Sequence, residues 1–207
     1  MDENLITTFR EKANENDYCY RTYSRYNGKN LWNCICSAMD WITVGVSNIS
    51  FRPDTEFLGH RSETTIEVLT LLMRIAMIKE GIEQLHRVIF ETNEIYLNKD
   101  ISVWTDNQFG LTDNEYFETL CACFGAHPVN LKGFKGLKNE ERRFSSWSFC
   151  GLGKFTVILY PSTIMGEDIS IEISFEQLEQ YIEKRYFHLT ELTNLLEQKI
   201  QTESIVE

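Results

Sequence analysis

One stretch of the sequence gathers residue types that could act on a phosphate group. His127 is followed by Pro128, and the chain then carries a run of basic side chains: Lys132, Lys135, Lys138, Arg142 and Arg143. A protonatable imidazole beside several cations can donate a proton to a phosphate or hold its charge. Gly133 and Gly136 favour a flexible loop, in which these cations could converge on one anion.

A helix is predicted to position the imidazole. Thr112 and Glu115 have the spacing of a capping box, in which a hydroxyl and a carboxylate each bind a free backbone amide. The apolar residues that follow at helical spacing are Phe117, Leu120, Cys121 and Phe124. Because Pro128 disfavours the helical conformation at His127, we expect this ring at the C-terminal end of the helix, where the dipole favours a cation. The alternative interpretation is a helix that simply ends at His-Pro, with a solvated loop after it.

The stretch DNEYFETLCACFGAHPVNL, with ERRFSSWSF after it, resembles the active-site helix of HEPN-type proteins. These are helical proteins of bacterial and archaeal toxin–antitoxin and antiphage systems, and their hallmark is an Arg-x4-6-His motif at the end of a bundle helix. The histidine of the motif would be His127. Positions 120 to 122 hold Leu120, Cys121 and Ala122, so that Cys121 stands in the usual place of the arginine.

The resemblance implies a metal-independent endoribonuclease or its degenerate descendant, with no cofactor. His127 would be the acid or base, while the ribose 2′-hydroxyl of RNA attacks the neighbouring phosphate. The phosphate-binding role of the missing arginine would fall to Arg142, Arg143 or Arg74, with Lys132 and Lys135 beside them. The resemblance also implies a homodimer, in which the histidine-bearing helix ends of two subunits share a cleft.

Two other functions remain open. The first is a non-catalytic binding module that senses a nucleotide, an RNA or a protein partner through the same dimer cleft, and the missing arginine favours it. The second is a thiol nucleophile at Cys121 with His127 as its base, although burial on the apolar helix face would raise the pKa of that thiol. Cys123 and His127 could also share a helix face and bind a metal, but we favour Cys123 as a small core residue.

Composition limits the classes of function. The chain of 207 residues has a formal net charge of −11, with 43% hydrophobic and 25% charged residues. These values predict one globular domain and argue against a broad surface for nucleic acid or an anionic membrane. The sequence has no apolar run long enough to span a membrane, no secretory signal at its charged start and no C-x-x-C pair. We therefore expect a cytoplasmic protein.

The periodicity of the apolar residues predicts a mainly α fold with a bundle of four principal helices, and the resemblance implies that this bundle is HEPN-like. The expected helices lie near 29–50, 63–92, 113–127 and 175–200, and strict alternation near 154–174 predicts a small antiparallel β-hairpin. Residues 1–28 open with a short amphipathic piece, and we expect the tyrosine-rich segment 15–28 that follows it to pack at the edge of the bundle. Arg74 lies in the most apolar part of its helix, whereas His86 and Arg87 near the end of that helix are expected at the surface.

Overall fold

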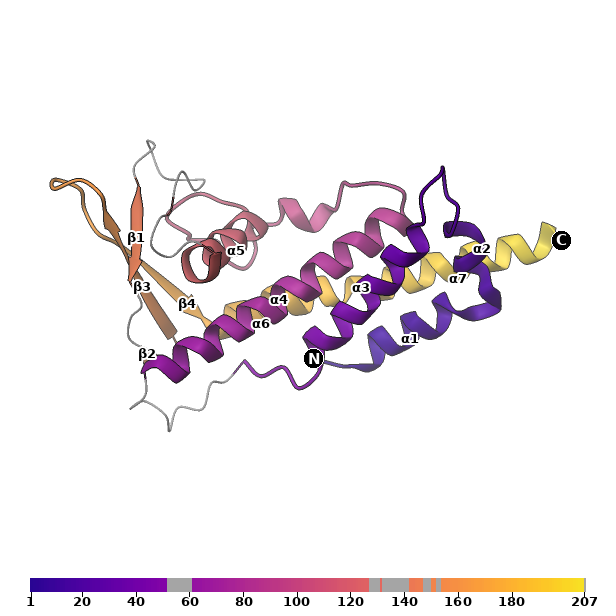
Figure 1. Ribbon diagram of the computed structural model, residues 1–207, viewed down its shortest axis with the longest axis horizontal. Helices are drawn as coiled ribbons and strands as arrows, with labels where there is room; N and C mark the ends of the chain where they lie inside the picture. The colour runs from indigo at the N-terminus through magenta and orange to yellow at the C-terminus, as the bar shows by residue number, and fades with distance from the viewer. Residues whose placement is uncertain (52–60, 127–130, 132–141, 147–149, 152–153, 207) are drawn as a thin grey trace. The chain divides into compact units, whose positions relative to one another are not determined.

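The computed structural model describes residues 1–51, 61–126, 131, 142–146, 150–151 and 154–206 (Figure 1). These residues are mainly helical and include a small antiparallel sheet. They form two compact units: Met1–Ile49, Arg74–Ile95 and Ile182–Glu207 make the first, and Ser50–Met73 with Tyr96–Tyr181 makes the second. None of the described helices combines the length and the apolar character that a membrane span needs.

The first unit is a set of packed helices. It contains α1 (Asn4–Ala13), α2 (Tyr18–Tyr23), α3 (Leu31–Val46) and α7 (His188–Val206), with the second half of α4 (Arg61–Ile89) and the last residues of α6 (Phe175–Tyr186). Helix α1 lies against both α3 and α7. The end of α6 also binds this segment: the buried phenol of Tyr186 donates to the carbonyl of Asp2 at 2.8 Å and accepts from the amide of Ile6 at 3.3 Å. The amino-terminal segment is therefore an integral part of the helical core.

Helices α3 and α4 approach closely because each presents a glycine to the other. A Cβ added to Gly45 on α3 would lie 2.5 Å from Cγ1 of Ile78 on α4. A Cβ added to Gly81 on α4 would lie 2.5 Å from Cγ1 of Ile42 on α3. Each isoleucine thus fills the space above the opposite glycine, which brings the two backbones together.

The second unit contains the β-sheet. Strand β3 (Lys154–Pro161) pairs antiparallel with β4 (Ile169–Ser174) on one side, and with β1 (Arg143–Ser146) and β2 (Cys150–Gly151) on the other. The buried side of the sheet carries alternate residues of the two long strands: Phe155, Val157, Leu159, Ile171 and Ile173. The start of α6 follows β4 directly, where the hydroxyl of Ser174 accepts from the amide of Gln177 at 3.4 Å.

Helix α5 (Asp113–Cys121) also belongs to the second unit, together with the 3₁₀-helix η3 (Tyr96–Lys99) and the start of α4. The ring of Phe117 on α5 stacks on Tyr181 of α6 with centroids 4.8 Å apart. After Cys121 the backbone continues as a π-helical turn, η4 (Ala122–Ala126). Of the apolar face predicted for this stretch, Phe117, Leu120 and Phe124 are buried and Cys121 is half-buried, and the helix changes type after Cys121.

The mainly α class and the antiparallel pairing near 154–174 are confirmed. Three of the predicted helices correspond to α3, α4, and α5 with its π-turn. The expected helix at 175–200 is wrong in one respect, because the chain breaks at Phe187 into α6 and α7. Helices α1 and α2 and strands β1 and β2 were not predicted as such.

Candidate functional site

The helix that leads to the predicted site begins as its sequence indicates. The Thr112 hydroxyl accepts from the amide of Glu115 at 3.3 Å, and the Glu115 carboxylate accepts from the amide of Thr112 at 3.2 Å. This complete capping box fixes the start of α5. The turn at its other end is π-helical, so its backbone hydrogen bonds span five residues instead of the four of an α-helix. Such a distortion is common near functional sites. His127, Lys132 and Lys135 lie outside the described residues.

The two cysteines near the end of α5 differ in environment. Cys121, at the expected arginine position, is half-buried, whereas Cys123 is fully buried. Burial, together with the nearby Cys121, raises the pKa of the Cys123 thiol to about 12. Cys123 is therefore a neutral thiol at pH 7, which suits a core residue better than a metal ligand.

The two arginines that end the basic run have different surroundings. Arg142 is exposed, and its backbone carbonyl accepts from the amide of Ser162 at 3.0 Å. Arg143 is 7% exposed, and its guanidinium donates to the carbonyls of Leu159 at 3.5 Å and Glu167 at 2.5 Å. Arg143 therefore binds backbone groups at the β3–β4 end of the sheet, while Arg142 can still reach an anion in solvent.

Arg74, the third arginine considered for phosphate binding, belongs to the first unit. Its guanidinium donates to the carbonyl of Ser47, the residue that follows the last turn of α3. A cation at this position satisfies a carbonyl that the helix leaves unpaired and favours the negative end of the helix dipole. This contact gives Arg74 a structural role at the end of α3.

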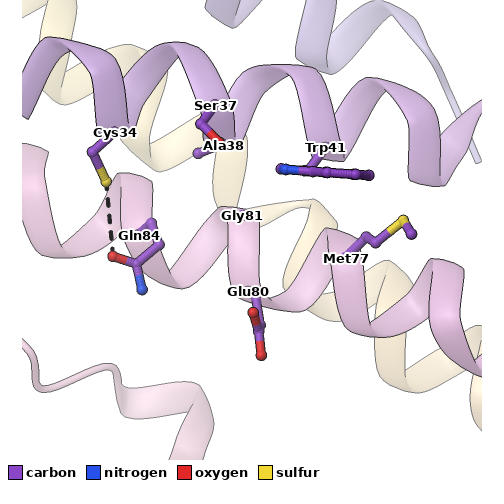
Figure 2. Close-up of a pocket in the computed structure, with 8 residues that line it drawn as sticks. All are labelled: Cys34, Ser37, Ala38, Trp41, Met77, Glu80, Gly81 and Gln84. Atoms are coloured by element: carbon purple, nitrogen blue, oxygen red, sulfur yellow. Dashed lines mark hydrogen bonds between the residues drawn. The ribbon is translucent and has the colours of Figure 1, made fainter.

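Within the described residues, no group of three or more His, Cys, Asp and Glu side chains is placed to hold a metal ion. The same residues contain a surface groove of about 470 Å³ between α3 and α4, at the glycine contact (Figure 2). Figure 2 shows the ring of Trp41 lying between the two helices, with Met77 below it. At the other end of the groove, Sγ of Cys34 lies 3.8 Å from Oε1 of Gln84. Arg74, the predicted site residue that belongs to the same unit, does not line this groove.

Sequence reasoning missed a buried pair of histidines. His86 on α4 is 4% exposed, so the expectation of a surface position for it is wrong. His188, the first residue of α7, is 2% exposed, and its ring contacts that of His86. Neither residue belongs to a recognisable motif. The available signal was their place on apolar helix stripes: His86 lies four residues after Ile82 and three before Ile89, and His188 lies four before Leu192.

No protein-family model matches this chain, and neither a curated protein nor a solved structure was found that is similar to it.

Proposed function

We propose that the chain is a HEPN-like protein of a defence or toxin–antitoxin system whose ribonuclease site is degenerate. The observation that carries this proposal is the residue at position 121: a half-buried cysteine stands where the resemblance calls for a guanidinium. In this proposal the protein is cytoplasmic and acts as a homodimer, and RNA contacts the end of α5. The remaining anion contacts come from Arg142 and from Lys132 and Lys135.

The chemistry of RNA cleavage explains why this one residue matters. RNA supplies its own nucleophile, so the protein need only orient it, move protons and stabilise the charge that develops on the phosphate. A single charge-stabilising donor is worth about 3–4 kcal/mol, or a factor of about 10²–10³ in rate. Arg143 and Arg74 donate to backbone carbonyls, so neither is a ready substitute. A site with His127 and without the arginine should therefore cleave RNA very slowly.

The test restores the missing cation. Purified wild-type protein, Cys121→Arg, and Cys121→Arg combined with His127→Ala are incubated with labelled single-stranded and structured RNA in EDTA. We expect wild-type cleavage near background and an increase of about 10²-fold or more in Cys121→Arg. That increase should disappear when His127 is also replaced, because the arginine acts only together with the imidazole.

A matched control separates the position of the new charge from the charge itself. Glu118 is exposed on α5, one turn before Cys121, so Glu118→Arg adds a cation outside the Arg-x4-6-His spacing. Glu118→Arg should leave cleavage at the wild-type level. Equal activation by both arginine substitutions would indicate non-specific RNA binding and would contradict a degenerate catalytic site.

The second candidate is a binding module that never cleaved RNA, and the engagement of Arg143 and Arg74 with carbonyls favours it as well. The two candidates predict different results for Cys121→Arg: a degenerate ribonuclease should gain cleavage, and a binding module should not. If RNA binding of the wild type, measured by fluorescence anisotropy, weakens in Arg142→Ala while no variant cleaves RNA, the binding module is the better description. If no variant either binds or cleaves RNA, both descriptions that involve RNA are wrong.

A further inference from the structure

The two buried histidines form a hydrogen-bonded pair between α4 and α7. Nδ1 of His86 lies 2.8 Å from Nε2 of His188, and both residues belong to the first unit. The ring of Phe90, one turn after His86, stacks on His86 with centroids 4.5 Å apart and on His188 at 5.9 Å. Phe90 is 37% exposed, so its ring covers the pair on the side toward solvent.

The charged group that faces the pair is Glu191 on α7. Its Oε2 lies 3.0 Å from Nδ1 of His188, and its side chain is 53% exposed. On α4, the ion pair between Lys79 and Glu83, 3.2 Å long, lies on the same helix face as His86, two turns and one turn before it. The segment that follows α4 contributes the backbone of Glu94, which interacts with His86.

The 2.8 Å distance between the rings allows one hydrogen bond in the neutral pair. A neutral imidazole carries one N–H and one bare nitrogen. Either ring can therefore donate to the other, according to which nitrogen of each ring carries the hydrogen. The contact between the two rings is a hydrogen bond when both rings are neutral.

Protonation of both rings destroys this arrangement. Two imidazolium rings would point N–H groups at each other across 2.8 Å, with no lone pair between them and with two like charges in a buried site. The contact between His86 and His188 must then open. The chain allows such movement, because it breaks at Phe187, just before His188, so that the start of α7 can shift without unwinding α6.

We propose that the His86–His188 pair is a pH-sensitive connection that holds the start of α7 against the end of α4 near neutral pH and releases it on acidification. Burial lowers the pKa of both rings from the ordinary 6.5, and the neighbouring His188 lowers the pKa of His86 further. Glu191 opposes the shift at both rings.

The lowered pKa values determine in which direction the stability of the folded state changes with pH. A histidine whose pKa is lower in the folded state binds fewer protons than in the unfolded state whenever the pH is below about 6.5. The stabilisation is therefore complete above pH 6.5 and is lost progressively as the pH falls through the lowered pKa values. Acidification therefore weakens the contact between α4 and α7, whereas a rise in pH above 7 leaves it unchanged.

The test measures the rings and the helix separately. Imidazole nitrogen NMR on the full chain should show both rings neutral at pH 7 and both titrating below 6.5. Glu191→Gln should lower the pKa of His188 further because it removes the opposing charge. Amide hydrogen exchange, corrected for its intrinsic pH dependence, should show protection of residues 188–196 falling by about tenfold or more between pH 7 and pH 5.5.

Variants distinguish this device from ordinary loss of stability in acid. His86→Leu combined with His188→Leu replaces both polar partners by apolar groups of similar size, a change that buried sites often tolerate. In this double variant the protection of residues 188–196 should change by less than about twofold over the same pH range. His60→Gln, which removes a histidine elsewhere in the chain, should keep the wild-type response. The proposal is wrong if either ring titrates at or above 6.5, or if the double variant responds to pH as the wild type does.

Discussion

At the residue scale, Asp113 shows how one carboxylate can hold a segment that has no regular structure. Asp113 is fully buried at the start of α5. Its two oxygens accept hydrogen bonds from the backbone amides of Ser102, Val103 and Trp104 at 3.0 to 3.3 Å. The side chain thus satisfies consecutive amides that lie outside any helix or strand, and it fixes Trp104 against the rings of Tyr116 and Tyr181.

Replacing Asp113 should therefore cost far more than its single charge suggests. Asp113→Ala leaves buried amides without an acceptor, and we expect a loss of about 3 kcal/mol in the free energy of unfolding, measured by urea denaturation. Asp106→Ala, an exposed aspartate in the same segment, is the control and should change this free energy by less than about 0.5 kcal/mol. Similar effects of the two substitutions would show that the amide contacts of Asp113 contribute little.

Single residues were predicted from the sequence where the signal is local. The capping box of Thr112 and Glu115 depends only on spacing within one turn, and the structure confirms it. The role of Asp113 depends on residues ten positions away, so the sequence showed only an acidic residue in a first helical turn. His86 was misplaced for a similar reason: its partner, His188, is distant in the chain.

At the element scale, the contact between α3 and α4 gives a direct test of close packing. Gly81→Ala would gain about 1 kcal/mol of helix propensity in an isolated helix. In the protein its Cβ would lie 2.5 Å from Ile42 Cγ1 and 3.1 Å from the carbonyl oxygen of Ala38, so the helices must separate. We expect a net loss of about 1–3 kcal/mol in the free energy of unfolding.

The control for this substitution lies next to it on the same helix. Glu80 is exposed, so Glu80→Ala changes the helix propensity by less than about 0.7 kcal/mol and adds no atom against α3. Thermal unfolding followed by circular dichroism should show a lower midpoint for Gly81→Ala than for Glu80→Ala. An unfolding midpoint for Gly81→Ala at or above that of the wild type would show that α3 and α4 can move apart without a loss of stability.

There are physical reasons why some helices and strands were not predicted from the sequence. The apolar stripe of the expected helix at 175–200 continues across Phe187, because Ile182, Tyr186 and Leu189 are all buried on either side of the break. Periodicity therefore could not reveal that the helix ends there. Strands β1 and β2 have only four and two residues, too short for alternation to be recognised. The two long strands, β3 and β4, were predicted because alternation extends through both.

At the scale of the whole molecule, the net charge of −11 restricts how two copies could pair. The proposed homodimer would bring two acidic chains together, so its interface must be mainly apolar and its formation opposed by long-range repulsion. Salt screens such repulsion. Light scattering after size exclusion should give twice the chain mass of 24.3 kDa, with self-association strengthening between low and high salt. A mass of one chain at all salt concentrations would contradict a cleft shared between subunits.

The candidate site as a whole was only partly accessible to sequence reasoning. Spacing identified the start of the helix that leads toward His127, which is a local feature. It could not show that Arg143 and Arg74 bind backbone carbonyls, because those carbonyls come from residues far along the chain. Only the tertiary structure shows that Arg143 and Arg74 already have these partners. Arg142 and the lysines are therefore left as the candidates that could stabilise charge on a phosphate.

The meeting of α3 and α4 has one more consequence. Both helices carry the same tetrapeptide pattern, Ile-x-x-Gly, as Ile42 to Gly45 and as Ile78 to Gly81. Since each isoleucine meets the other helix's glycine, the helices run antiparallel and the pattern pairs with itself. Sliding one helix by a single turn, about 5.4 Å, would face both isoleucines with larger residues at once. The repeated tetrapeptide therefore sets the register of these helices, and any other alignment loses both contacts together.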